Sequence, residues 1–348
     1  MLKWYEQSVP DGDVVISSRV RLARNLEGYK FSPLLKESEA VKLVDEVKGI
    51  TSALAEQDNR KYYSCNLKSL SEIDKAAMVE RHIVSPLLVE KEQATGLILS
   101  DDETVSIMIN EEDHVRIQAI VGGLNLEEAY DIANRIDDIA YEKLRFAYDE
   151  KYGYITSCPT NVGTGMRASC MVFLPALSAA RLINKLIEEV GRYGVTIRGI
   201  YGEGTKSMGS IYQISNQKTL GNSEKEIIQN LNRIVDQVIK QERKRREYML
   251  SVNADEIENQ VYRSYGILKY ARQISSSDAM TLLSQIKFGM DTGLIKFDRE
   301  FNVHKLMMGI QPGCLQWALG KSVGSTTRDK ARAEYISKEL PNIVEKTE

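Results

Sequence analysis

Five arginines that precede residue 200 lie in or beside segments with the composition of β-strands: Arg19, Arg21, Arg116, Arg167 and Arg198. Arg19 and Arg21 are two residues apart, so an extended segment would place both side chains on one face. Each arginine alone could lie on a solvated sheet face, with its aliphatic stem over apolar surface. Together they indicate a binding site for phosphate oxygens, because a planar guanidinium makes paired hydrogen bonds with them.

The elements that must position these arginines are predicted from the hydrophobic pattern. Segments typical of strands are 14–18, 96–100, 104–109, 115–121, 168–174, 195–201 and 210–215. Short polar turns join several of them, which favours antiparallel hairpins over strand–helix–strand units. Beyond Tyr248 the pattern is helical. We therefore predict an α+β fold, with an antiparallel β-sheet flanked by helices in residues 1–250 and an all-helical domain in residues 251–348.

Helix signals also place the domain boundary. The sequence predicts helices from Asn125 to about 140, over 177–193, 255–270 and 277–290, and from about residue 326. A capping box at Ser223 and Glu226 opens a further long helix. That helix runs into the basic segment 240–246, which we interpret as a solvated helix end and as the boundary. The alternative, a nucleic-acid patch, is disfavoured because the segment stands alone in a near-neutral chain.

The composition excludes several classes of protein. The 348 residues hold 46 Lys and Arg against 49 Asp and Glu, a formal net charge of −3, so no basic field exists to bind nucleic acid or an anionic membrane. No apolar run approaches the ~20 residues of a membrane span, and the start lacks the apolar core of a signal peptide. We therefore expect a cytoplasmic protein whose four cysteines are free thiols. Without a CxxC pair, and with three scattered histidines, we expect no structural metal site.

Common catalytic motifs are absent. The nearest approach to a Walker phosphate loop is the segment 199–207, in which Thr205 displaces Lys206 from its required position after a glycine. The sequence also lacks the H-R-D and D-F-G loops of protein kinases, G-x-S-x-G and H-E-x-x-H. An enzyme with this sequence must therefore use less common catalytic residues.

Four segments resemble, in order, the signature blocks of the phosphagen (guanidino) kinases: SSRVRLARN from residue 17, NEEDH from 110, CPTNVGTGMRAS from 158 and RGIYGEGT from 198. The resemblance covers roughly residues 14–214, and the block from 158 is the most specific. Within this family, the whole chain is similar to the bacterial kinases that phosphorylate arginine residues of proteins, which join this catalytic domain to a helical C-terminal domain. The resemblance implies ATP with Mg²⁺ and transfer of the γ-phosphoryl group to a guanidinium nitrogen.

The resemblance assigns catalytic roles to Glu112, Glu203 and Cys158. An acceptor guanidinium is a poor nucleophile because its nitrogen lone pair is delocalised, so two carboxylates would align it and accept a proton. The Cys158 thiolate would help to orient it, with Thr160 as a hydrogen-bond donor. The alternatives are that Glu112 is a solvated loop acid and that Cys158 is a buried apolar thiol. Glu111 and Asp113 would support the loop or the water shell of the metal.

The resemblance also implies which residues bind the nucleotide. The five arginines would hold the phosphates, and His82 would pack on the adenine or ribose unless it is a helix-surface histidine. Met171 stands where small-molecule members carry a histidine, which leaves the adenine contact there open. The full predicted set is Ser17, Ser18, Arg19, Val20, Arg21, His82, Arg116, Arg167, Ala168, Ser169, Cys170, Met171, Arg198, Gly199, Ile200, Tyr201 and Gly202.

A second element, in the helical domain, resembles the R-D-x-x-R-A motif with which protein-arginine kinases bind phosphoarginine outside the active site. It comprises Arg328, Asp329, Arg332 and Ala333. The two arginines are one helical turn apart and could hold a phosphate, while the aspartate holds a guanidinium. The alternative is an ordinary surface helix with charges spaced by four residues.

The substrate is predicted from what precedes the first block. Small-molecule members carry a helical domain there that closes over the free guanidino compound, whereas this chain has a short leader. We therefore expect an open acceptor side and an arginine that projects from a protein. The alternatives are a small-molecule guanidino kinase and a phosphoarginine-binding adaptor with a vestigial kinase domain. The resemblance further implies a homodimer, a Clp-type chaperone–protease partner, a transcriptional repressor as substrate, an activator protein and allosteric control in the stress response.

Overall fold

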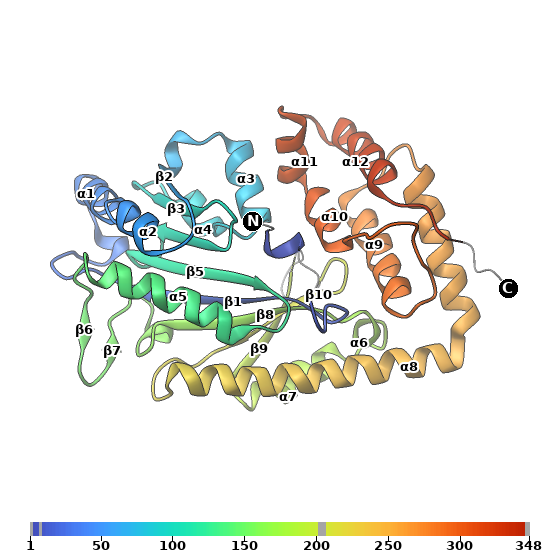
Figure 1. Cartoon of the computed structure of the whole chain (residues 1–348), viewed down its shortest axis with the longest axis horizontal. Coiled ribbons are helices and arrows are strands. Elements are labelled where there is room, and N and C mark those ends of the chain that lie inside the picture. The colour runs from blue at the N-terminus through green and yellow to red at the C-terminus, as the bar shows by residue number, and fades with distance from the viewer. Residues whose placement is uncertain (1–2, 7–8, 201–206, 345–348) are drawn as a thin grey trace.

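The computed structural model of the chain describes residues 3–6, 9–200 and 207–344. Its centre is an antiparallel sheet of eight strands in the order β2-β3-β4-β5-β1-β8-β10-β9 (Figure 1). The strands are β1 (Val15–Arg24), β2 (Tyr62–Asn66), β3 (Gly96–Ser100), β4 (Val105–Ile109), β5 (Val115–Gly122), β8 (Met166–Phe173), β9 (Val195–Gly199) and β10 (Ile211–Asn216). A separate hairpin pairs β6 (Tyr148–Asp149) with β7 (Gly153–Tyr154). The seven predicted strands are confirmed with shifted ends, and β2 is an additional edge strand.

Helices cover the sheet and continue into a helical C-terminal region, which confirms the predicted α+β fold (Figure 1). The first part contains α1 (Glu37–Lys48), α2 (Thr51–Gln57), α3 (Glu72–Glu80), α4 (Pro86–Glu90), α5 (Leu126–Tyr141), α6 (Pro175–Ala179) and α7 (Ile183–Gly191). The rest comprises α8 (Glu224–Tyr270), α9 (Ser276–Asp291), α10 (Val303–Gly309), α11 (Pro312–Leu319) and α12 (Ser325–Glu339). Four short 3₁₀ turns are η1 (Trp4–Glu6), η2 (Ser32–Leu34), η3 (Leu67–Ser69) and η4 (Pro159–Asn161). No helix in the described ranges is both long enough and apolar enough to span a bilayer.

The two faces of the sheet differ in chemistry because side chains alternate along each strand. One face packs against α5, α7 and α8 and is apolar, with Val20, Ile117, Ala168 and Ile214 buried in its core. The opposite face carries the polar residues of the same strands. This alternation therefore places the predicted arginines on the face away from the main core.

Two helix predictions are corrected by the structure. The segment 177–193 is not one helix, because the chain breaks between α6 and α7 at Arg181, which adopts a left-handed conformation with φ of 57°. The predicted long helix does not end in the basic segment, because α8 continues to Tyr270 and is kinked at Asn253, where φ is −136° and ψ is 38°. Figure 1 shows α8 passing from the sheet into the helical region.

The interpretation of the basic segment 240–246 as a solvated helix end is therefore wrong. Arg246 is buried and donates to Glu242 at 2.8 Å, and Arg243 pairs with Asp11 and Asp13. The Glu242 carboxylate is fully buried and also accepts the backbone N–H groups of the first turn of α6. The acidic partners of Arg243 come from the start of the chain, about which the local pattern around residue 246 carries no information.

The helical region packs against the polar face at one end of the sheet. There the strands present apolar residues, including Ile120 and Phe173, which share one core with residues of α9 and α10 such as Met280 and Leu306. Helix α11 docks on α3, where Glu80 accepts the backbone N–H groups of Gly313 and Cys314 at 2.8 and 2.7 Å. This contact brings the helical region next to the polar end of the same face.

Candidate active site

The pairing register places all five predicted arginines on one face of the sheet. Arg21 of β1 lies directly opposite Arg167 of β8, and Arg19 lies opposite Ser169. Arg116 of β5 pairs with Ala23, two residues along from Arg21, and Arg198 of β9 pairs with Gln213. Residues that face each other across neighbouring strands project to the same side. The structure therefore brings together residues that are almost 180 positions apart in the sequence.

These arginines have few anionic partners. Arg19 donates to the side-chain oxygen of Gln213 at 2.7 Å, and Arg167 donates to Ser215 Oγ at 3.3 Å. Within the described ranges, only Arg116 of the five forms ion pairs, with Glu111 and Glu112. The Nε atoms of Arg21 and Arg167 are buried without a hydrogen-bond partner among the described residues. A group of cations with so few carboxylate partners among the described residues is suited to bind a polyanion.

Burial and the repulsion between neighbouring cations also lower the pKa values of three of these arginines. Burial lowers the pKa of Arg19 to about 10, and Arg116 and Arg167 act in the same sense. Burial and the neighbouring arginines also lower the pKa of Arg21 well below its usual value. For Arg167, burial, Arg198 and Arg116 lower the pKa, whereas Cys158 and Glu112 act in the opposite sense. The two predicted catalytic residues in the described ranges thus lie at the edge of the arginine cluster.

Glu112 lies in the turn between β4 and β5, which is held rigidly. Asn110 adopts a left-handed conformation with φ of 61°, and its backbone N–H donates to His114 O at 2.8 Å. Lys91 donates to the Glu111 carbonyl at 2.7 Å and also binds Ser32. The Glu112 carboxylate is left partly exposed, 3.5 Å from Arg116 Nη2. The turn therefore holds the backbone of Glu112 beside the cations and leaves its carboxylate accessible.

The acids that flank Glu112 support this turn. Glu111 is buried and accepts hydrogen bonds from Arg116 Nη1 at 2.7 Å and from Ser85. Asp113 is buried and accepts from Asn25 Nδ2 at 2.7 Å and from Ser157 N at 2.6 Å. Of the two roles considered for these acids, the structure favours support of the loop.

Asp113 also links the turn to the segment that carries Cys158. Ser157, which it binds, directly precedes Cys158, and the Cys158 sulfur lies 3.0 Å from Thr160 Oγ1. Cys158 is partly exposed, so it is not the buried apolar thiol of the alternative interpretation. Cys170 and Cys314 are buried, and burial raises the pKa of each thiol to about 12.

The predicted nucleotide residues divide between the two faces. Ser17, Arg19, Ser169 and Met171 line a cavity on the arginine face, and His82 completes it from the end of α3. His82 lies two residues beyond the end of α3 and is partly buried, so it is not on the surface of that helix. Burial and the neighbouring Arg19 lower its pKa to about 3, so the imidazole is neutral. Residues on the core face could contact a nucleotide only through their backbone, and these are Ser18, Val20, Ala168 and Cys170.

Several predicted residues fall outside the described ranges. They are the second catalytic acid, Glu203, and the nucleotide residues Tyr201 and Gly202. The residues just before them are described: Gly199 ends β9, and Ile200 packs against the core shared with the helical region. The roles assigned to Glu203, Tyr201 and Gly202 stay predictions.

The sequence reasoning missed four polar residues that shape this face. Gln213 and Ser215 alternate along β10 and contact the arginines, so the strand pattern alone could have assigned them to the polar face. Ser85 and Lys91, at the two ends of α4, hold the Glu112 turn through hydrogen bonds to Glu111. No local signal marks these two, because their partners are known only once the chain has folded.

Comparison with known proteins identifies the family. A sequence profile for the ATP:guanido phosphotransferase C-terminal catalytic domain matches residues 42–245, and one for the protein-arginine kinase McsB C-terminal domain matches residues 254–348. A protein-arginine kinase from Halothermothrix orenii is 43% identical over 337 residues, which cover 97% of this chain and 96% of the relative. One from Clostridium kluyveri is 45% identical over 327 residues, with 94% of each chain covered. The chain belongs to the protein-arginine kinase family.

Solved structures agree with this assignment at the level of the fold. Lombricine kinase superposes with a TM-score of 0.59 at 25% identity, and 68% of each chain is covered. A substrate-free duplicated taurocyamine kinase from Schistosoma mansoni gives a TM-score of 0.58 at 26% identity, with 77% of this chain and 40% of that chain covered. The arginine-bearing sheet is therefore the catalytic fold of guanidino kinases.

In this member of the protein-arginine kinase family, the R-D-x-x-R-A element lies in the first half of α12. Arg332 is almost fully buried and donates to the carbonyl oxygens of Ile310 and Ile274 and to the Asp329 carboxylate. Arg328 and Asp329 are partly exposed, and Arg328 Nε has no partner among the described residues. Ala333 is buried. Arg328 and Asp329 could thus contact a ligand, whereas Arg332 is buried and hydrogen-bonds to the Asp329 carboxylate. The role of Arg332 as a second phosphate-binding residue stays a prediction.

Proposed function

We propose that this protein is an ATP-dependent protein-arginine kinase, which transfers the γ-phosphoryl group of ATP to arginine side chains of other proteins. The observation that carries the proposal is the set of five arginines on one sheet face with Glu112 and Cys158 at its edge. The names of the relatives, and the match to both domains of a protein-arginine kinase, support a protein as the acceptor.

In this proposal, the residues of the site have different roles in the reaction. The arginines bind the phosphates and neutralise the charge that spreads over their oxygens during transfer. Glu112, and Glu203 by resemblance, align the acceptor guanidinium, and Glu112 accepts its proton as the N–P bond forms and ADP leaves. Cys158 contacts the guanidinium beside them. Because both reactants are held in place, most of the rate enhancement comes from positioning and charge.

Magnesium enters with ATP as part of the substrate and supplies further charge neutralisation there. The arginine cluster suits a polyphosphate, since its cations have few protein anions as partners. Among the described residues, no cluster of three or more histidines, cysteines and acids could hold a metal ion. Protein contacts to the triphosphate of MgATP would therefore go to its oxygens.

Arg328 and Asp329 are proposed to bind phosphoarginine outside the active site. Arg328 would contact the phosphate and Asp329 the guanidinium, and Arg332 would keep Asp329 in place through their hydrogen bond. By resemblance, we further propose a cytoplasmic homodimer under allosteric control. It would act in the stress response with an activator protein, phosphorylate a transcriptional repressor and mark proteins for a Clp-type chaperone–protease.

The test is to incubate the full chain with MgATP and an unfolded, arginine-containing protein and to analyse the products by mass spectrometry under non-acidic conditions. The expected product is acid-labile phosphoarginine in the protein. Phosphorylation of free arginine alone would favour the small-molecule guanidino kinase. Binding of phosphoarginine without any transfer would favour the adaptor.

A further inference from the structure

The cavity on the arginine face is lined partly by residues that the sequence motifs do not include. Its lining comprises five predicted nucleotide residues, namely Ser17, Arg19, His82, Ser169 and Met171, together with Ile120 of β5, Gln213 of β10 and Trp4 of η1. Trp4 is 2% exposed, and its ring centroid lies 6.4 Å from that of His82. The tryptophan therefore lies beside His82, for which a contact with the adenine or ribose is predicted, and lines the same cavity as Met171, where the adenine contact is left open.

The chemistry of this wall suits a purine. An indole offers a flat aromatic face on which a base can stack. Its N–H group normally finds an acceptor when it is buried, yet Trp4 Nε1 has none within the described part of the chain. A purine can stack on the indole with its flat face, or it can accept a hydrogen bond from the N–H group with a ring nitrogen at its edge. The imidazole of His82 is neutral near pH 7, because burial and Arg19 lower its pKa to about 3.

The cavity is too small for a base in the present conformation. Its free volume of about 10 Å³ is room for about one water molecule. The strands that form its floor belong to the centre of the sheet, and His82 is held by a hydrogen bond from Gln118 to its carbonyl oxygen. Unlike the strands of the floor, η1 is a single 3₁₀ turn outside the sheet, so it is the wall that we expect to move when a base enters.

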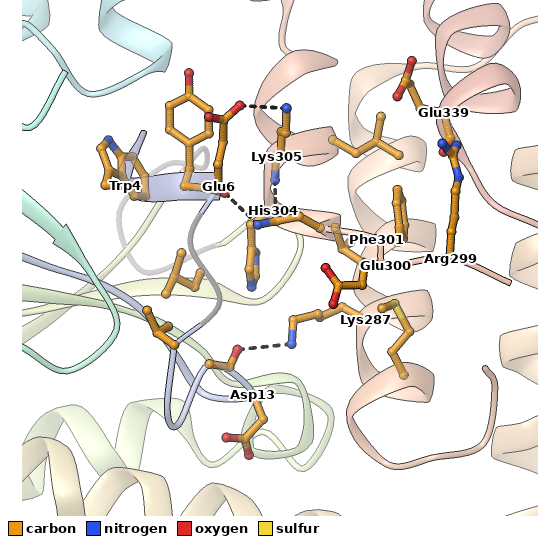
Figure 2. Close-up of a pocket in the computed structure, with 18 of the residues that line it drawn as sticks. Trp4, Glu6, Asp13, Lys287, Arg299, Glu300, Phe301, His304, Lys305 and Glu339 are labelled. Atoms are coloured by element: carbon orange, nitrogen blue, oxygen red, sulfur yellow. Dashed lines mark hydrogen bonds and ion pairs between the residues drawn. The ribbon is translucent and has the colours of Figure 1, made fainter. Parts of the chain in front are cut away.

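Polar contacts hold η1 between the two parts of the chain. Lys3 donates to Glu103 at 2.6 Å on the catalytic side. On the helical side, Lys305 donates to Glu6 at 2.7 Å, and Asn302 donates to the Tyr5 carbonyl at 2.7 Å (Figure 2). Trp4 also borders a second, larger cavity of about 690 Å³ between η1 and the helical region. Figure 2 shows Trp4 among the residues that line it. This cavity gives η1 space into which it can shift when a base enters.

We propose that Trp4 is a purine-contacting residue, which fills the base end of the nucleotide site in the free protein and forms its wall when ATP is bound. The inference rests on the proposed function, because it requires that ATP is the substrate. It adds a base contact from the N-terminal turn where the motifs of the sheet provide phosphate contacts.

The experiment uses the fact that the chain has two tryptophans. In a Trp317→Phe variant of the full chain, Trp4 is the only tryptophan, and its emission is titrated with MgADP while calorimetry measures binding. The expected result is a saturable loss of emission with the same midpoint as the calorimetric curve. Tripolyphosphate, which has phosphates but no base, should bind without this loss. In a Trp4→Phe variant, the half-exposed Trp317 should show no saturable change.

A second pair of variants tests the energetics. Trp4→Ala should weaken MgATP binding by about 5- to 100-fold, as expected for the loss of one base-stacking contact, while Trp4→Phe should stay within about threefold of the unchanged chain. The affinity for tripolyphosphate should be the same in both variants. If Trp4→Ala does not fold, the emission of Trp4 in the Trp317→Phe chain still decides the question.

Two results would overturn the inference while the proposed function stands. One is calorimetric binding of MgADP with unchanged Trp4 emission, and the other is an equal loss of emission with tripolyphosphate. If calorimetry detects no nucleotide binding to the Trp317→Phe chain, the proposed function fails together with the inference.

Discussion

Two groups of arginines in this molecule have opposite surroundings. On the sheet face, Arg19, Arg21 and Arg167 are half-buried, and none has a carboxylate partner among the described residues. At the junction with the helical region, Arg246 is more deeply buried and contacts Glu242, Asp13 and Asp291. The comparison indicates that the presence of a carboxylate partner distinguishes two roles of arginine. A buried arginine that is paired with a carboxylate supports the fold, whereas an arginine without such a partner is available to a ligand.

The largest expected effect concerns the carboxylate at the edge of the unpaired group. Glu112→Gln should reduce phosphoryl transfer by about 10²- to 10⁴-fold, because a positioned general base contributes that much. Nucleotide affinity, measured by calorimetry, should change little. The control is Glu128→Gln, which alters an exposed acid of α5. Full activity in Glu112→Gln would show that this carboxylate is a solvated loop acid.

The paired group should determine stability. Arg246→Met leaves the buried Glu242 carboxylate without its cationic partner, and removal of one member of a buried ion pair costs about 3–5 kcal/mol. Urea denaturation should show this loss in the free energy of unfolding. Lys244→Met, at an exposed position of the same helix, should stay within about 0.5 kcal/mol. Equal stability of the two variants would remove the distinction between the groups.

The unpaired group should show the reverse behaviour. Arg167→Met should weaken MgATP binding by about 10- to 100-fold, as expected for a lost hydrogen bond to a charged group. The free energy of unfolding should stay the same or rise, because the change removes a cation that Arg116 and Arg198 repel. Arg233→Met on α8 is the matched control. A loss of stability comparable with that of Arg246→Met would contradict the comparison.

The smallest effect is the response of His82 to pH. Burial and Arg19 lower its pKa to about 3, whereas an unfolded histidine titrates near 6.5. The unfolded chain therefore binds the proton first, and stability falls as the pH drops from 6.5 toward 3. At pH 5 the loss from this residue is about 2 kcal/mol. His82→Gln should show a shallower decline between pH 7 and 5 in denaturant titrations, and an unchanged slope would place the histidine in water.

Most of the fold could be predicted because its signals are local. Alternating apolar residues separated by polar turns marked seven strands of the sheet, and the capping box at Ser223 marked the start of α8. The missed edge strand β2 has a largely exposed face, with Tyr63 62% exposed, so it lacks a clear apolar alternation. The break at Arg181 depends on one left-handed residue that the hydrophobic pattern of 177–193 does not reveal.

The candidate site was predictable in its residue types and only partly in its arrangement. The two-residue spacing of Arg19 and Arg21, together with the motif blocks, is enough to indicate phosphate binding. Lys91 and Trp4 carried no such signal, because a lysine or a tryptophan in isolation is compatible with many environments. The support that Lys91 gives to the Glu112 turn, and the role that we propose for Trp4, follow from contacts with Glu111 and His82, which lie elsewhere in the sequence.

By itself, the sequence determined the chemistry: strand periodicity places the arginines on one face, and the motifs name the acids and the cysteine that belong with them. Only the tertiary structure decided which arginines are paired with carboxylates in the fold and which are left without such a partner among the described residues. Arg246 meets a carbonyl oxygen that lies 233 positions earlier in the chain, and Arg243 meets Asp13 at a separation of 230. Charge pairing over such distances depends on packing, whereas periodicity depends only on neighbouring residues.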